Sequence, residues 1–310
     1  MNWFLNTFSD KAALRKLMVR TSIALLLLVA AVIAARWYRS TEAGVDFISA
    51  FPGETELPAG TPVGFPWWLN FQHFLNAFFI VLIARTGWLV RTTQRPAAYW
   101  VRNNRGLFRT KGEPRKISLD LWLHQTLDVL WVANGITFIV LLFTSGQWAR
   151  LVPTSSEIFP NAVSAALQYA SLDWPLENGW VNYNSLQQLA YFTVVFVAAP
   201  IAIITGIRMS NAWPGPAAKI SKIYPLALAR ALHLPVMIFF VLFIVVHVTL
   251  VLTTGAMRNL GHMYAGTDTV GWLGLGLFAG SVILTVLAWF AVKPALLQPL
   301  ASIGGKVTRQ

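Results

Sequence analysis

Six apolar runs constrain this chain more than any other feature of its sequence. They cover residues 18–36, 70–90, 121–145, 185–207, 227–252 and 271–292. A helix rises about 1.5 Å per residue and the hydrocarbon layer of a membrane is about 30 Å thick, so each run is long enough to span it. A backbone exposed to lipid must satisfy its own hydrogen bonds, which favours helices. The sequence therefore predicts an all-α integral membrane protein with six transmembrane helices.

The composition agrees with this prediction and excludes an ordinary soluble domain. Of the 310 residues, 56% are hydrophobic and 12% are charged, and the mean hydropathy is +0.57. The stretches between the runs are too short for a second domain of usual size. We expect one membrane domain over residues 1–310, with a four-helix core at 65–255 and one extra helix at each end, 18–36 and 271–292. The first extra helix resembles a signal peptide, and we expect an uncleaved signal anchor.

The formal net charge of +12 is distributed by membrane side, which argues against a surface for nucleic acid. The N-terminal segment, the second and fourth loops and the C-terminal tail hold 19 of the 24 Lys and Arg residues. The alternate segments hold Arg36, Arg39, Arg150 and Arg258. Because basic segments stay on the cytoplasmic side, we expect both termini in the cytoplasm.

The absence of cysteine removes several kinds of redox site. No residue of the chain is Cys, which excludes disulfides, thiolate metal sites, iron–sulfur clusters and covalent attachment of haem. Any haem bound here must be held by ligands to its iron and by packing alone.

Four of the five histidines fall within apolar runs, where an uncompensated polar ring is costly. His233 and His247 lie fourteen residues apart in one run. A helix advances about 21 Å over that interval and turns almost a whole number of times, so both rings are expected on one face at opposite depths. His73 and His124 lie in the second and third runs.

Alternating span directions give each histidine a depth in the membrane. His73, near the start of the second span, shares the level of His247, and His124, at the start of the third, shares the level of His233. We therefore expect two haems, held by the pairs His73 with His247 and His124 with His233. Two imidazoles leave the iron no open position, which suits electron transfer. The alternative for each histidine is an ordinary interhelical hydrogen bond.

Few other charged side chains lie within the spans. Asp128 is one turn from His124 on the same helix face, so it can hold a proton for quinone chemistry, orient the ligand or pair with Arg85. A purely structural ion pair is the alternative. The candidates to neutralise haem propionates are Arg85, Arg208 and Arg258, because guanidinium matches the geometry of a carboxylate.

Four further features are expected to be structural. Pro200 is expected to interrupt the fourth span and kink its helix. Residues 156–170 of the third loop form a possible surface helix. His262, in the loop before the last span, is expected to be a solvated residue. A glycine series in the last span favours close helix packing rather than a dinucleotide loop, and it consists of Gly271, Gly274, Gly276 and Gly280.

The histidine pattern resembles the di-haem cytochrome b561 superfamily, in particular the cytochrome b subunits of bacterial formate dehydrogenase, nickel–iron hydrogenase and thiosulfate-reductase-like complexes. The resemblance covers residues 65–255 and rests on His233 and His247 in one helix, on Phe71-Gln72-His73-Phe74 and on Leu123-His124-Gln125. It implies two non-covalent haem b groups in a bacterial cell membrane. The distribution of basic residues implies that the first ligand helix crosses the membrane from outside to inside. The formate dehydrogenase type implies the opposite direction, and the histidine pairs are the same in either orientation.

Together these features predict a membrane cytochrome that transfers electrons between the quinone pool and a redox partner, as a subunit of a larger oxidoreductase. The resemblance implies a periplasmic or cytoplasmic partner such as a molybdopterin oxidoreductase or a hydrogenase. Without a flavin or nicotinamide domain the chain is not expected to accept hydride alone. Two other functions remain open: a stand-alone transmembrane reductase of metal or superoxide, and a haem-free transporter, against which the missing inverted repeat weighs.

Overall fold

A computed structural model describes residues 11–105, 113–174, 178–215 and 218–309. Within these ranges six helices are long and apolar enough to cross a membrane. They are α2 (Lys11–Ser40), α4 (Trp67–Thr92), α5 (Leu119–Thr144), a composite span (Ser185–Met209), α10 (Leu226–Thr253) and α12 (Trp272–Ala291). Each predicted apolar run falls on one of them, so the prediction of six spanning helices is confirmed.

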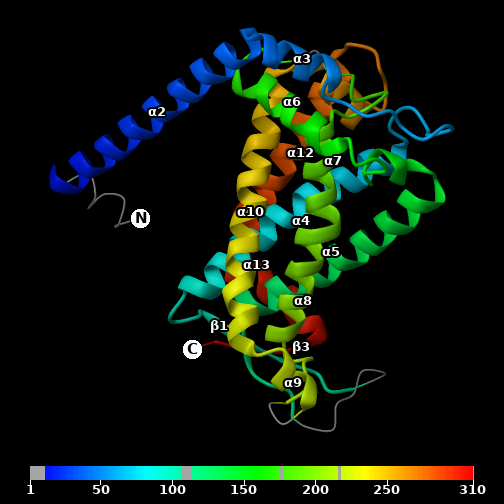
Figure 1. The fold of residues 1–310 in the computed structure, drawn as a ribbon. Helices are drawn as coiled ribbons and strands as arrows, with labels where there is room; N and C mark the ends of the chain where they lie inside the picture. The colour runs from blue at the N-terminus through cyan, green and yellow to red at the C-terminus, as the bar shows by residue number, and fades with distance from the viewer. Residues whose placement is uncertain (1–10, 106–112, 175–177, 216–217, 310) are drawn as a thin grey trace.

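The centre of the fold is a four-helix bundle of α4, α5, the composite span and α10 (Figure 1). α4 packs along α5, and the second half of the composite span packs along α10. α4 also contacts α10, which joins the two helix pairs. Consecutive spans run in opposite directions, so the start of α4 and the end of α10 lie at one end of the bundle, and the starts of α5 and α10 lie near the other.

Local sequence signals fix where these helices begin. Pro66 and Pro225 are the N-cap residues of α4 and α10, with extended backbone and no N–H that needs a partner. The side chain of Ser118 accepts a hydrogen bond from the backbone N–H of Leu121 at the start of α5. Asn184 forms a reciprocal capping box with Gln187 at the start of the composite span. The cap residues thus position the first turn of each helix in the bundle.

The composite span changes from α-helical to π-helical geometry about halfway along its length. It consists of α7 (Ser185–Phe192), the π-helical turn η2 (Thr193–Ala198) and α8 (Ala199–Met209). Pro200 stands at the beginning of α8 and has no N–H to bond the preceding turn, so the backbone adopts a π-helical turn there. The prediction that Pro200 interrupts the fourth span is confirmed.

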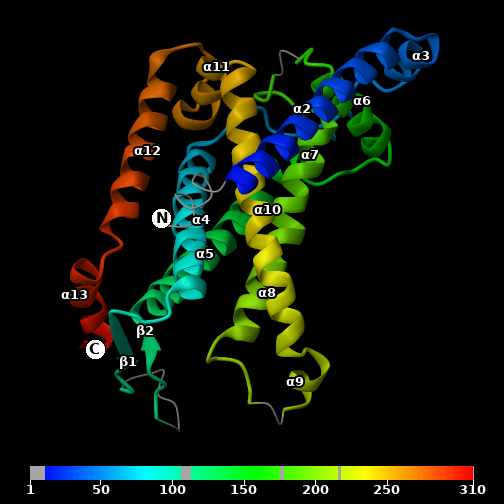
Figure 2. The same cartoon turned by 90° about the vertical axis from the view of Figure 1, so that its left-hand side faces the viewer.

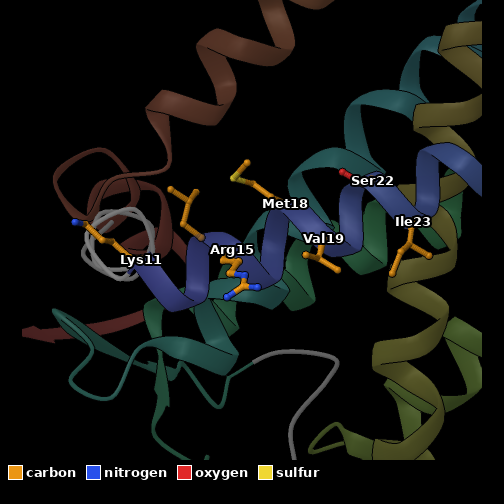
Figure 3. A pocket seen from close by; sticks show the side chains of 7 residues that line it. Lys11, Arg15, Met18, Val19, Ser22 and Ile23 are labelled. Carbon is orange, nitrogen blue, oxygen red and sulfur yellow. The ribbon is translucent and has the colours of Figure 1, made fainter.

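The first span, α2, extends away from the bundle at one end of the molecule (Figure 1). It contacts the short helix α3 (Glu42–Ala50) and the surface helix α6 (Ile158–Ala170), which confirms the predicted helix in the third loop. Arg39 Nη2 forms an ion pair with Asp173 Oδ2 at 2.8 Å beyond the end of α6. One hollow lies along the first turns of α2 (Figure 3), and all its lining residues come from this helix, so it is helix surface rather than a ligand cavity.

The last span, α12, packs against α4 and against the π-helical turn η3 (Gly261–Ala265) that follows α11 (Ala256–Leu260). A Cβ on Gly274 would lie 2.4 Å from the carbonyl oxygen of Leu260, so only glycine fits at this crossing. The predicted close packing is therefore found at Gly274. A Cβ on Gly271, Gly276 or Gly280 would meet no atom within 4 Å among the described residues.

A small antiparallel sheet, absent from the all-α prediction, closes one end of the bundle. Its strand order is β2-β1-β3, with β1 (Ala98–Arg102), β2 (Ile117–Ser118) and β3 (Gly305–Arg309). Helix α13 (Pro294–Gly304) covers the sheet, and Trp100 Nε1 donates a hydrogen bond to the carbonyl of Ala301 at 2.9 Å. Figure 2 shows the sheet and α13 at the opposite end of the bundle from α11. The remaining short elements are η1 (Gln147–Arg150) and α9 (Lys219–Ile223).

Candidate functional site

Four histidines meet in two pairs inside the bundle. The ring centres of His73 on α4 and His247 on α10 are 6.3 Å apart. Those of His124 on α5 and His233 on α10 are 6.4 Å apart. We call His124 and His233 the sheet-side pair, because they lie toward the β-sheet, and His73 and His247 the loop-side pair. The structure brings together the same histidines that share a predicted depth.

The spacing within each pair fits two imidazoles on opposite sides of one metal ion. An imidazole nitrogen binds a metal at about 2 Å and lies about 1 Å from the centre of its own ring, so the two ring centres should be about 6 Å apart. Both pairs have this separation. The ring planes are inclined at 59° and 82°, which such a geometry allows because each ring can rotate about its own bond to the metal.

Among the described residues, His, Cys, Asp and Glu side chains do not complete the coordination of such a metal. In the part of the chain that the structure describes, no group of three or more His, Cys, Asp or Glu is placed to hold a metal ion. Two facing imidazoles without further protein ligands match a metal whose remaining ligands belong to a macrocycle, as in haem. The donor set therefore fits haem better than a free metal ion.

The loop-side pair is surrounded by aromatic rings. Phe243 stacks on His247 with ring centres 5.4 Å apart, and Tyr191 meets the same imidazole edge-on at 5.9 Å. Tyr264 lies edge-on to His73, also at 5.9 Å. Nδ1 of His73 is buried and has no hydrogen-bond partner among the described residues. A buried polar nitrogen of this kind requires an explanation, and a bound group is one.

The sheet-side pair has hydroxyl partners that the sequence analysis missed. Oγ1 of Thr86 on α4 lies 3.0 Å from Nδ1 of His124. Oγ1 of Thr205 on α8 lies 2.8 Å from Nδ1 of His233. In each case the threonine is followed by glycine. This repeated Thr-Gly dipeptide, each time in the span before a ligand candidate, was the available signal.

Asp128 lies beside the sheet-side pair. Its Oδ2 is 3.7 Å from Nε2 of His124, a distance longer than a hydrogen bond. The side chain is partly exposed. Three roles were predicted for Asp128: holding a proton, orienting the ligand and pairing with Arg85. Among the described residues, Asp128 and Arg85 form no ion pair. Instead, Arg85 donates to the carbonyl oxygen of Trp289 and lies over its indole ring at 4.8 Å.

The other two predicted propionate partners have different environments. Arg208 Nε donates to the carbonyl oxygen of Tyr224 at 2.6 Å, and its guanidinium lies 5.2 Å from the ring centre of Trp213. Arg258 forms an ion pair with Asp268 at 3.0 Å. Arg258 therefore already has a carboxylate partner, whereas the contacts of Arg208 are neutral.

The prediction that His262 is a solvated loop residue is wrong. His262 is 2% exposed because η3 folds back against α4 and the loop before it. Its Nε2 lies 2.6 Å from Oδ1 of Asp268, and its ring lies 5.3 Å from that of Trp180. Burial lowers the pKa of His262. The hydrogen bond from His262 in turn lowers the pKa of Asp268.

Arg150 is the other buried charge that sequence reasoning passed over. It is 1% exposed, and it donates hydrogen bonds to the carbonyl oxygens of Gly64, at 2.9 Å, and Gly179. Its guanidinium lies over the rings of Phe65, at 5.0 Å, and Tyr183, at 4.8 Å. Its Nε is buried without a hydrogen-bond partner among the described residues. These contacts are neutral, and none of the described residues pairs a carboxylate with Arg150.

A family model described as prokaryotic cytochrome b561 matches residues 64–266. The matched segment begins just before α4 and ends just after η3, so it includes both histidine pairs and all four helices of the bundle. No curated protein and no solved structure matches the chain.

Proposed function

Because the chain belongs to the prokaryotic cytochrome b561 family, a family of membrane electron-transfer proteins that bind haem b, we propose that it is a di-haem subunit linking quinone to a redox partner. Its six candidate spans make it a multi-pass protein of a bacterial membrane. The number of haems, their ligands, the quinone and the partner are the parts that we propose.

The single observation that carries this proposal is the presence of two histidine pairs with the separation that a bis-imidazole metal needs. His73 and His247 would hold one haem, and His124 and His233 the other. Both pairs use α10, on which His233 and His247 are separated by about 21 Å, so these residues would hold the two haems near opposite ends of the span. When bound, the haems supply two one-electron couples across the membrane. The four helices keep the ligands in place and exclude water.

Arginines at both levels suit the haem carboxylates. Arg85 and Arg208 are in the same helices as Thr86 and Thr205, which contact the sheet-side imidazoles, and both donate hydrogen bonds to backbone carbonyl oxygens. We assign them to the sheet-side haem. At the other level we assign Arg150, whose buried charge has no carboxylate partner among the described residues. A buried guanidinium in this state is stabilised by an anion, and a propionate provides one.

Asp128 is our candidate for proton transfer to or from quinone. Oxidation of a quinol releases protons together with electrons, so a quinone site next to a haem needs a nearby proton acceptor. Asp128 is adjacent to His124 and its side chain is partly exposed on the surface of the span, so its carboxylate would be within reach of a quinone bound beside the sheet-side haem. An acidic residue within a span has a functional role by default.

The orientation follows from charge. The end of the bundle with the β-sheet carries the basic residues of the second loop and the C-terminal tail, including Arg102, Lys116 and Lys306. Positively charged segments remain on the cytoplasmic side. We therefore place the sheet-side haem and both termini toward the cytoplasm. The redox partner, of the molybdopterin oxidoreductase or hydrogenase type, docks at the other haem.

A direct test uses the protein purified in mild detergent. Addition of a reduced quinol analogue is expected to produce the absorption bands of ferrous low-spin haem b, and a companion polypeptide is expected to co-purify. A chain that reduces ferric chelates or superoxide alone, and has no companion, would indicate the stand-alone reductase instead. A folded protein that contains no haem and takes up none when haem is added would contradict the proposal and favour a transporter.

A further inference from the structure

Two threonines contact the sheet-side histidines in the same way. Thr86 and Thr205 lie in α4 and α8, which run in the same direction, and each hydroxyl meets Nδ1 of the histidine near the start of the next span. The distances, 3.0 Å to His124 and 2.8 Å to His233, are those of hydrogen bonds. The arrangement occurs on both sides of one proposed haem.

The direction of these hydrogen bonds follows from the position of the hydroxyl protons. Oγ1 of Thr86 lies 2.8 Å from the carbonyl oxygen of Leu82, and Oγ1 of Thr205 lies 2.7 Å from that of Ile201. A carbonyl can only accept, and a hydroxyl that donates its one proton to the carbonyl of its own helix is left to accept from the imidazole.

The same reasoning fixes the tautomer of both rings. A neutral imidazole carries one N–H, and with the hydroxyls oriented in this way it lies on Nδ1 in His124 and His233 and donates to the threonine. Nε2 is then unprotonated and has a free lone pair. This is the nitrogen available for iron, so both rings are held in the form that can bind it.

Glycine makes the close approach possible. A Cβ on Gly87, next to Thr86, would lie 3.1 Å from Cε1 of His124. A Cβ on Gly206, next to Thr205, would lie 3.7 Å from Cε1 of His233. The first distance is tighter than ordinary contact. Gly87 therefore lets α4 pass close to the ring of His124 while Thr86 reaches Nδ1, whereas the distance at Gly206 is that of ordinary contact.

The loop-side pair has a different environment. Nδ1 of His73 is buried and has no hydrogen-bond partner among the described residues, and an aromatic ring, Tyr264, is its neighbour. The two proposed irons are therefore bound by imidazoles of different character. A hydrogen bond donated through Nδ1 raises the basicity of the imidazole as a ligand, and a more basic ligand stabilises ferric over ferrous iron.

We propose that Thr86 and Thr205 are positioning residues that hold His124 and His233 as Nδ1–H tautomers and lower the reduction potential of the haem between them. The inference rests on the proposed ligation. It gives a physical reason why two haems of the same type in one chain would have different reduction potentials.

The test is a redox titration of purified Thr86→Val and Thr205→Val, followed by absorbance of the haem bands. Valine keeps the branched shape of threonine but removes the acceptor. In each variant one of the two midpoint potentials is expected to move upward while the other stays at its wild-type value. Thr205→Ser, which retains a hydroxyl, is expected to restore the wild-type potential.

Thr193→Val is the matched control. Thr193 lies in the same span as Thr205, and its hydroxyl donates to the carbonyl of Leu189 at 2.8 Å in the same manner. Its substitution is expected to leave both potentials unchanged. If Thr193→Val moves a potential as much as Thr205→Val does, the shift is a general effect of the missing hydroxyl and the inference is overturned.

The remaining outcomes separate this inference from the proposed function. A wild-type protein without two haems contradicts the proposed function before any threonine is changed. Two haems whose potentials are unaffected by both valine variants overturn the inference alone. If Thr205→Val fails to retain haem, the serine variant decides: restored haem at the wild-type potential supports the inference, and failure of serine as well overturns it.

Discussion

His73, in the second turn of α4, and His247, in the next-to-last turn of α10, face each other with ring centres 6.3 Å apart. The pair arises because α4 begins at the level where α10 ends. The same antiparallel relation between successive spans brings His124 to His233 at the other level. One helix, α10, therefore takes part in both pairs.

The ligand assignment predicts a selective loss of haem. His247→Ala is expected to remove the loop-side haem and spare the other, because His124 and His233 keep both of their rings. The haem content of the purified variant, determined by pyridine haemochrome, should fall by half. His262→Gln is the matched control, since His262 is a buried histidine outside both pairs, and it should retain the full content. Equal haem loss in both variants would argue against the assignment.

The role proposed for Asp128 predicts an effect on quinone chemistry without loss of haem. Asp128→Asn is nearly isosteric but cannot accept a proton in the same way. Reduction of the haems by a quinol analogue should slow by about 10²-fold or more, as for removal of a general base. Stopped-flow absorbance measures this rate. An unchanged rate with intact haem spectra would leave Asp128 with a structural role only.

Substitution of Arg150 and of Arg258 separates an arginine that neutralises a haem propionate from one that only stabilises a loop. Arg150→Met removes the buried charge and should lower the potential of the loop-side haem, because a nearby positive charge stabilises the reduced form. It also removes a donor from the carbonyl of Gly179, at a cost of about 1–3 kcal/mol, whereas the carbonyl of Gly64 keeps its hydrogen bond from Gln147 Nε2 at 3.1 Å. Arg258→Met should leave both potentials unchanged, since Arg258 is paired with Asp268. The reverse pattern in a redox titration would exchange these assignments.

The contact between buried His262 and exposed Asp268 predicts that acid loosens η3. Burial lowers the pKa of His262 from its ordinary value of 6.5, and the hydrogen bond from His262 lowers the pKa of Asp268 from 3.8. In both groups the folded form binds fewer protons than the unfolded form, so stability is fully present at higher pH and is lost as pH falls. The loss begins below about pH 6.5 with His262 and continues at lower pH with Asp268.

Hydrogen exchange of residues 261–268 measures this effect. The measured quantity is the ratio of the exchange rate at about pH 5 to that at about pH 7, corrected for the intrinsic rate. This ratio should be larger in the wild type than in His262→Gln, which has no titrating ring at this position. The same pH dependence in both proteins would rule out His262 as its source.

The spans and the histidine pairs were predictable because they depend on patterns local to each run. Hydropathy fixes which residues cross the membrane, and the alternating direction of successive spans gives His73 and His124 their depths. Helical periodicity does the same for His233 and His247. These inferences need no knowledge of which helices touch.

The features that sequence reasoning missed depend on such contacts. Thr86 and Thr205 are ordinary span residues until the next helix brings an imidazole to each hydroxyl. Arg150 has the sequence context of a loop cation, but the chain before α4 and the segment around Gly179 enclose it. His262 is buried because η3 turns back onto α4, and β1 finds its partner β3 at the far end of the chain. Long-range packing decides each case.

The central claim is most directly tested by the number of haem b groups per polypeptide in the purified chain, measured by pyridine haemochrome against a protein concentration from amino-acid analysis. The account predicts two non-covalent haems, one for each histidine pair. A ratio of one, or of none, in protein that remains folded in detergent would contradict it.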